Sequence, residues 1–303
     1  MPARFNAYVP DAAALVRVLE DDTLYRIGRS AECELRVEHW SISRFHAELS
    51  GHGFDWSLRD TGSKNGLRVD GHLALRAEFD KSSWFSIGDV YCWFEMLDDA
   101  AAQRHRAEGD ARRATSRALS QQLVPGIGIR ALIPQTLDVV LELAGLERGF
   151  VLYAEDGNAL RVRASRGFAV DDIANTKFAG SAAAVDRALA EGRSIVCCDA
   201  LDSPWLGARP SVRLGGIRGL VCVPLRLSDK SIGAIYADSR KPGAPVTELD
   251  LELIENVARH AAAAFEAARL ERDVADIVRS AADAGVRAPL WNDLRPPADP
   301  AGD

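Results

Sequence analysis

Three short strings near the start of the chain combine side chain types that bind an anion. They read Ile27-Gly28-Arg29-Ser30, Ser43-Arg44-Phe45-His46 and Asp60-Thr61-Gly62-Ser63-Lys64-Asn65-Gly66. An arginine guanidinium forks onto two phosphate oxygens, and a hydroxyl donates one short hydrogen bond. An asparagine carboxamide both donates and accepts, so it can hold an extended peptide backbone. Together the strings predict a site for a phosphate group and the peptide that carries it.

Short strands separated by turns surround these strings. Residues 54–59 alternate strictly, which places Phe54, Trp56 and Leu58 on one face, and residues 91–96 carry aromatic side chains on both faces. Strands of period two, with no helical period between them, predict a β-sandwich over residues 1–97. Four tryptophans are expected to give this small domain buried area: Trp40, Trp56, Trp84 and Trp93.

Residues 1–97 resemble a forkhead-associated (FHA) domain, a β-sandwich that binds phosphothreonine peptides through the loops at one end. The family pattern is Gly-Arg, then Ser-x-x-His, then Asn-Gly following Gly-Ser, and all three parts are present in that order. The resemblance implies that Arg29 and Ser43 contact the phosphate and that Asn65 holds the backbone beside the phosphothreonine. It implies further peptide contacts from the same loops, at Arg44, Ser63 and Lys64.

Three other residues are implied to be structural parts of the binding loops. They are Gly28, His46, which braces a loop, and Gly66, which allows a turn. Many family members carry Thr where this chain carries Lys64, so a charge here replaces a hydroxyl that reads the phosphate.

Residues 126–270 alternate helix and strand patterns. Helical spacing covers 132–144 and 181–191, and strand patterns cover 150–153, 160–164, 221–227 and 232–237. The last two strands flank a short polar turn and are typical of a hairpin. The pattern predicts an α/β domain with a largely antiparallel sheet and flanking helices. Through residues 192–200, 217–225 and 232–238, this part resembles a GAF domain, a small-molecule sensor and dimerisation module.

No ligand of this second domain can be identified from its residues. Asn175-Thr176-Lys177-Phe178 is superficially similar to a cyclic-nucleotide signature, but the Asp-Glu pair that should follow is missing. The cysteines lack the histidine neighbour typical of bilin attachment, and His260 is the domain's single histidine. Cys197-Cys198 is either a redox sensor or a pair of inert buried thiols. An unidentified small-molecule ligand is left open.

The segments outside the two domains are polar. Residues 98–125 predict a polar helical linker, or a flexible one with a break at Gly109-Asp110. A long helix is expected over 247–284, capped by Thr247-Glu-Leu-Asp250, and its apolar stripe continues past Leu270. Residues 271–303 therefore comprise a helix extension and a Pro-rich tail expected to be disordered. The stripe predicts a homodimer, unless it folds back on residues 98–124.

Composition limits the function classes. The chain has 303 residues, with 37 Lys and Arg against 44 Asp and Glu, and its net charge of −7 disfavours nucleic acid and anionic membranes as partners. Five cysteines, none in a Cys-x-x-Cys pair, and the lack of a secretory signal favour a reducing cytoplasm. The nucleotide-binding P-loop, the dinucleotide fingerprint, and the hydrolase, metalloprotease and kinase motifs are absent. No enzyme, catalytic residue, metal or cofactor is predicted.

These observations predict a bacterial-type cytoplasmic signalling adaptor. Its FHA domain would capture a phosphothreonine protein, either a Ser/Thr kinase or a kinase substrate, and its GAF domain would dimerise or sense a small molecule. An alternative is a small-molecule-sensing regulator in which the GAF pocket is primary and the FHA domain only docks it. A weaker alternative is a redox enzyme that uses Cys197, Cys198 or Cys222.

Overall fold

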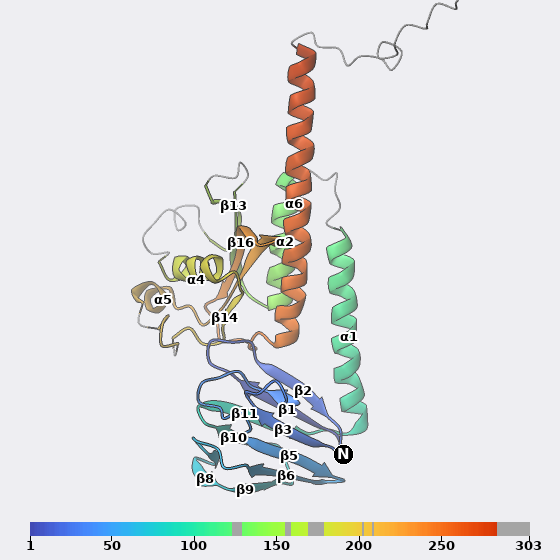
Figure 1. Ribbon diagram of the computed structural model, residues 1–303, viewed down its shortest axis with the longest axis vertical. Coiled ribbons are helices and arrows are strands. Elements are labelled where there is room, and N and C mark those ends of the chain that lie inside the picture. The colour runs from blue at the N-terminus through green and yellow to red at the C-terminus, as the bar shows by residue number, and fades with distance from the viewer. Residues whose placement is uncertain (123–128, 155–158, 169–178, 202, 208, 284–303) are drawn as a thin grey trace, which may run out of the picture.

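A computed structural model describes residues 1–122, 129–154, 159–168, 179–201, 203–207 and 209–283. A β-sandwich lies at one end of an elongated molecule, and an α/β domain lies beside it (Figure 1). The last turns of the long helix α6 (Glu248–Asp283) extend beyond every other labelled element. Among the described residues, no helix is both long enough and apolar enough to cross a membrane.

The sandwich consists of two sheets. The first has the order β2-β1-β11-β10-β7-β8, with bounds Leu15–Leu19, Ala3–Tyr8, Val90–Met96, Ser83–Ile87, Leu67–Val69 and His72–Ala74. The second has the order β4-β3-β5-β6-β9, with bounds Leu35–Arg36, Leu24–Gly28, Ala47–His52, Asp55–Asp60 and Arg76–Phe79. All neighbours are antiparallel except β3 and β4. Two sheets face to face bring the loops at each end together, as the binding motifs require.

Alternation along the strands builds the sandwich core, as predicted for Trp56 and Leu58, which are buried. The expectation was wrong for Phe54, which lies in the turn before β6 and is 70% exposed. Trp84 is 52% exposed because it lies on the outer face of β10, where it pairs with Trp93 of β11. Trp40 lies in a loop and is 81% exposed, so it contributes little to the core.

The second domain has an antiparallel sheet of order β13-β12-β16-β15-β14, with bounds Arg161–Arg166, Arg148–Tyr153, Lys230–Ser239, Gly219–Leu227 and Ile195–Cys197. Helices α2 (Ile129–Ala144) and α6 cover one face of this sheet. Helices α4 (Ala179–Glu191) and α5 (Pro210–Gly215) pack on the other face. The predicted hairpin is confirmed by the pairing of Leu227 with Lys230 across a tight turn.

Helix α1 (Asp99–Gln122) connects the two domains and continues without a break through Gly109. It runs beside the first half of α6, where Arg112 forms an ion pair with Asp250. The predicted cap of α6 is confirmed: Thr247 Oγ1 accepts the Asp250 N–H at 3.2 Å, and Asp250 Oδ2 accepts the Thr247 N–H at 2.8 Å. This reciprocal arrangement is a capping box, which satisfies donors of the first helical turn.

The loop between β1 and β2 docks the sandwich onto the second domain. The Ala14 N–H donates to the Val246 carbonyl at 2.9 Å, and the Glu248 N–H donates to the Ala14 carbonyl at 3.0 Å. Ala13 is buried within the apolar core of the second domain. The start of α6 is therefore held by both domains.

Candidate functional site

A cavity of about 310 Å³ opens between three loops of the sandwich. One loop follows β3, one lies between β4 and β5, and one lies between β6 and β7. The residues that line the cavity are Arg29, Trp40, Ser41, Ile42, Ser43, Arg44, Lys64 and Asn65. Five of the six predicted peptide contacts are among them, and Ser63 is the exception. The three strings, far apart in the sequence, thus meet around one hollow.

Backbone hydrogen bonds tie the three loops together. The Arg29 N–H donates to the Ser43 carbonyl at 3.0 Å, and the Lys64 N–H donates to Ser43 Oγ at 3.0 Å. Gly28 is held against the middle loop so closely that a Cβ atom would lie 2.2 Å from the Arg44 carbonyl oxygen. Only glycine fits there, so Gly28 sets the approach of the loop that carries Arg29.

His46 lies under the cavity and joins two loops. Its Nδ1 accepts the Ser43 N–H at 3.2 Å, and its Nε2 lies 3.1 Å from the Gly66 carbonyl oxygen. Because Nδ1 accepts and the carbonyl can only accept, the proton must be on Nε2. Burial lowers the pKa of His46, so the neutral ring is favoured. The imidazole therefore acts as a fixed brace between the Ser43 and Asn65 loops.

Asn65 is held by its amide nitrogen. Asn65 Nδ2 donates to the Ser41 carbonyl at 2.7 Å, and no described residue is recorded as donating to Asn65 Oδ1. The carboxamide oxygen therefore has the capacity to accept from a ligand. Gly66 follows with a φ of +78°, a conformation that side chains rarely adopt, so the turn depends on glycine.

Ser63 faces its own loop. Its hydroxyl donates to Asp60 Oδ2 at 2.6 Å and accepts the Gly66 N–H at 2.9 Å. Burial alone would raise the pKa of Asp60, but hydrogen bonds from the Ser63 hydroxyl and backbone outweigh it and lower the pKa. The single hydroxyl proton of Ser63 is thus engaged, and the side chain shapes the loop that presents Lys64 and Asn65.

The cations of the cavity have no carboxylate partner in the part of the chain that the structure describes. Among the described residues, no ion pair is recorded for Arg29, Arg44 or Lys64. By contrast, the nearby Arg26 donates to both oxygens of Glu34, at 2.8 and 3.1 Å, and these hydrogen bonds lower the pKa of Glu34 to about 2. The three cavity cations therefore form a concentrated positive field that is free to meet an anion.

Trp40 lines the cavity, although the sequence pattern predicted that it would be buried in the core. It precedes the buried Ser41 and Ile42, and its indole is 81% exposed at the cavity. The position of a tryptophan three residues before Ser43, inside a loop that carries a binding string, was a signal that could have identified it.

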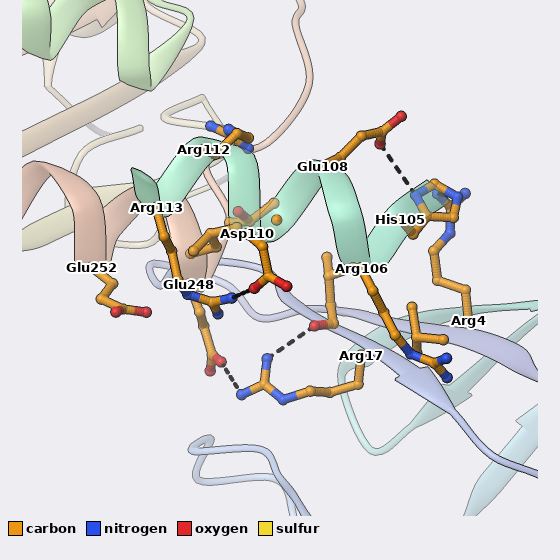
Figure 2. Close-up of a pocket in the computed structure, with 15 residues that line it drawn as sticks. Arg4, Arg17, His105, Arg106, Glu108, Asp110, Arg112, Arg113, Glu248 and Glu252 are labelled. Atoms are coloured by element: carbon orange, nitrogen blue, oxygen red, sulfur yellow. Dashed lines mark hydrogen bonds and ion pairs between the residues drawn. The ribbon is translucent and has the colours of Figure 1, made fainter. Parts of the chain in front are cut away.

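A second arginine-rich cavity, of about 730 Å³, lies between β2, α1 and the start of α6 (Figure 2). Its cations have partners. Arg17 pairs with Glu248 at 2.7 Å and Arg113 with Asp110 at 3.3 Å, as the dashed lines in Figure 2 mark. The others also form ion pairs: Arg4 with Glu95, Arg106 with Glu20 and Arg112 with Asp250. Three of these ion pairs, those of Arg17, Arg106 and Arg112, link the sandwich, α1 and α6 to one another.

The thiols of the second domain are unsuited to nucleophilic chemistry. Burial raises the pKa of Cys198 to about 11 and raises the pKa values of Cys197 and Cys222 further. The Cys197 thiol donates to Asp11 Oδ1 and the Cys198 thiol to the Ala12 carbonyl, both at 3.3 Å. Protonated thiols engaged in this way favour the inert alternative over redox chemistry.

The sequence raised two further possibilities for the second domain, a cyclic-nucleotide signature and a metal or haem site. Residues 175–178 lie outside the described residues. His260 lies on α6 beside α1, where it lines a cavity of about 320 Å³ with Arg113 and Ser116. Within the described part of the chain, no three His, Cys, Asp or Glu side chains converge as a metal site.

Two protein-family models match the chain in succession. The FHA domain model matches residues 25–88, and a GAF domain model matches residues 126–266. No curated protein matches the chain significantly.

Solved structures with similarity to the chain include domains of both kinds. The FHA domain of the CT664 protein from Chlamydia trachomatis is 19% identical over 32% of this chain and 100% of its own, with a TM-score of 0.30. Mycobacterium tuberculosis EmbR in complex with a low affinity phosphopeptide is 21% identical over 30% of this chain and 24% of its own, with a TM-score of 0.25. A GAF domain/HD domain protein from Geobacter sulfurreducens is 15% identical over 51% of this chain and 98% of its own, with a TM-score of 0.38. From the two family models, the chain contains an FHA domain followed by a GAF domain.

Proposed function

We propose that this protein is a phosphothreonine-dependent signalling adaptor. The observation that carries the proposal is the meeting of Arg29, Ser43, Arg44, Lys64 and Asn65 around one cavity. No described carboxylate forms an ion pair with the cations of this cavity. Both family models describe binding or regulatory domains. The partner is a phosphothreonine-containing protein, either a Ser/Thr kinase or a kinase substrate, and the five free thiols suit a reducing cytoplasm.

The geometry supports a division of labour around the phosphate. A phosphothreonine carries about −1.5 to −2 charges and three acceptor oxygens. Arg29 is exposed and can fork onto two of these oxygens. Because Ser43 Oγ accepts the Lys64 N–H, its own proton is available to donate to the third oxygen. Lys64 and Arg44 add charge from either side, and Asn65 Oδ1 accepts a backbone N–H of the peptide.

Direct binding tests the assignment. The full chain is titrated with a peptide that contains one phosphothreonine, with the same peptide after phosphatase treatment, and with its phosphoserine version. We expect binding of the phosphothreonine peptide and none of the dephosphorylated peptide. Equal affinity for the phosphorylated and dephosphorylated peptides would contradict the proposal.

Helix α6 supports a second part of the proposal, a homodimer. Its last residue with a buried side chain is Ala268, and large apolar side chains continue beyond it on one stripe, at Leu270, Val274, Ile277 and Val278. Ile277 is 67% exposed and Val274 is 59% exposed. Helix α1 covers the opposite end of α6, around Asp250, so the alternative of folding back is not what this structure shows. The simplest cover for the stripe is the same helix of a second copy.

A dimer would present two phosphopeptide sites and would gain avidity for clustered phosphothreonines. Light scattering on the full chain and on the variant Val274→Asp/Ile277→Asp tests this part. We expect a dimer mass for the first and a monomer mass for the second. A monomer mass for the full chain at micromolar concentration would overturn the dimer and leave the phosphopeptide assignment untouched.

A further inference from the structure

The indole of Trp40 is an exposed apolar surface placed directly on the charged cavity. Trp40 lines the same hollow as Arg29, Ser43 and Lys64, yet 81% of its surface is exposed. Large aromatic side chains in such positions lose hydration water when a ligand covers them, and they are frequent anchors of binding interfaces.

The backbone of the turn that presents this indole is ordered before any ligand arrives. The Ile42 N–H donates to the His39 carbonyl at 3.1 Å, which closes a turn with Trp40 at its tip. The next residue, Ser41, is buried, and its hydroxyl lies 2.8 Å from His39 Nδ1 and accepts the Asp89 N–H at 3.0 Å. The rings of His39 and Trp40 are 5.3 Å apart. Because the backbone around Trp40 is already ordered, a ligand that covers the indole loses little further backbone entropy.

The charges of the cavity restrict what can pack on the indole. A cationic side chain would gain from the aromatic face, but it would stand beside the cations Arg29, Arg44 and Lys64, for which the described residues provide no ion-pair partner. An uncharged side chain with a large apolar surface escapes this repulsion and covers the indole.

We infer that Trp40 is a specificity-determining residue, which selects phosphothreonine segments that carry an aromatic or large aliphatic side chain beside the phosphothreonine and rejects basic ones. The inference rests on the proposed function, because the phosphate anchors the segment in the same cavity. The indole thereby contacts the apolar surface of the ligand, and the cations bind its negative charge.

A peptide scan on the full chain tests the inference. Each peptide has a central phosphothreonine in an alanine background, and one of the three positions on either side carries Phe, Leu, Ala or Lys. For the wild type we expect at least one position where Phe or Leu binds about tenfold more tightly than Ala, and Lys more weakly than Ala. In Trp40→Ala the ratio of Phe to Ala should fall to about one, and Trp40→Phe should retain part of it.

Phe54→Ala is the matched control, because Phe54 is 70% exposed in the turn between β5 and β6, at the other end of the strands that enter and leave the binding loops. This variant should keep the wild-type ratio. A flat profile in the wild type, a preference for Lys, or an unchanged ratio in Trp40→Ala would overturn the role of Trp40. A wild type that does not distinguish phosphorylated from unphosphorylated peptides would overturn the proposed function itself.

Discussion

Two arginine-rich regions of this molecule differ in whether their cations have partners. In the cavity between the domains, Arg17, Arg112 and Arg113 all meet carboxylates. The pair of Arg17 with Glu248 joins β2 to the start of α6 (Figure 2), and the pair of Arg112 with Asp250 joins α1 to the same helix. In the cavity of the FHA loops, no described carboxylate pairs with Arg29 or Arg44. A paired arginine must lose its carboxylate partner before it can bind an anion. An unpaired arginine loses nothing, and the bound anion reduces the repulsion between it and the neighbouring cations. The ion pairs therefore distinguish a region where arginines link parts of the fold from a region where arginines are available to an anion.

Arg29→Ala should have the largest effect on ligand binding. Charge-assisted hydrogen bonds contribute ~1.5–3 kcal/mol each, so the affinity for a phosphothreonine peptide should fall at least tenfold at ~1.4 kcal/mol per decade. Isothermal titration calorimetry measures this change. Arg26→Ala is the matched control, since it removes the same charge three residues earlier from an arginine that Glu34 already occupies. Similar losses in both variants would mean that only the net charge matters.

Arg29→Lys sharpens the distinction between charge and geometry. Lysine retains the positive charge but lacks the planar fork that meets two phosphate oxygens. We expect an affinity between those of the wild type and Arg29→Ala, by the same titration. Binding equal to that of the wild type would show that Arg29 acts only by long-range attraction.

His46 should make the FHA domain sensitive to acid. Burial lowers its pKa in the folded state below the ordinary value of about 6.5, so the unfolded chain binds more protons as the pH falls. Stability should therefore be full above about pH 6.5 and should decrease below it. Denaturant unfolding at pH 7 and pH 5, followed by tryptophan fluorescence, tests this expectation. In His46→Asn the difference between the two pH values should be smaller, and an unchanged difference would assign the sensitivity to other groups.

Arg17→Ala should have the smallest effect, and on stability alone. Its ion pair with Glu248 is partly exposed, and such pairs contribute at most about 1 kcal/mol. Phosphopeptide affinity should stay within about twofold of the wild type, since the affected residue lies outside the binding loops. Thermal unfolding and the same titration measure both quantities. A large loss of affinity would show that the two cavities are coupled.

Local sequence patterns specified those features that depend on neighbouring residues. The capping box of Thr247 and Asp250 and the hairpin of β15 and β16 each require only a few successive residues. The loop strings were also readable, because alternating strands predict a sandwich and a sandwich brings its end loops together. The resemblance of these strings to the FHA pattern then assigned Arg29, Ser43 and Asn65 to one site before the structure was known.

The role of Ser63 was decided by geometry within its own loop. A serine in a binding string has one proton, and only the position of Asp60 shows that this proton is already engaged. The burial of the tryptophans also depends on geometry that the sequence does not show. Trp56 and Trp84 both lie on strands, but the register places one between the sheets and the other on the outer face.

What the sequence by itself determined was the order of the two domains and the set of side chains that could meet a phosphate. What only the tertiary structure decided was which cations remain available. Arg17 and Glu248 are 231 residues apart in the sequence, and Arg112 pairs with Asp250 on a different helix. No local pattern encodes such pairs, because they form only when the docking of domains and helices brings distant charges within a few ångströms. The exposure of Trp40 follows from the same cause, since burial depends on how the whole chain packs around a side chain.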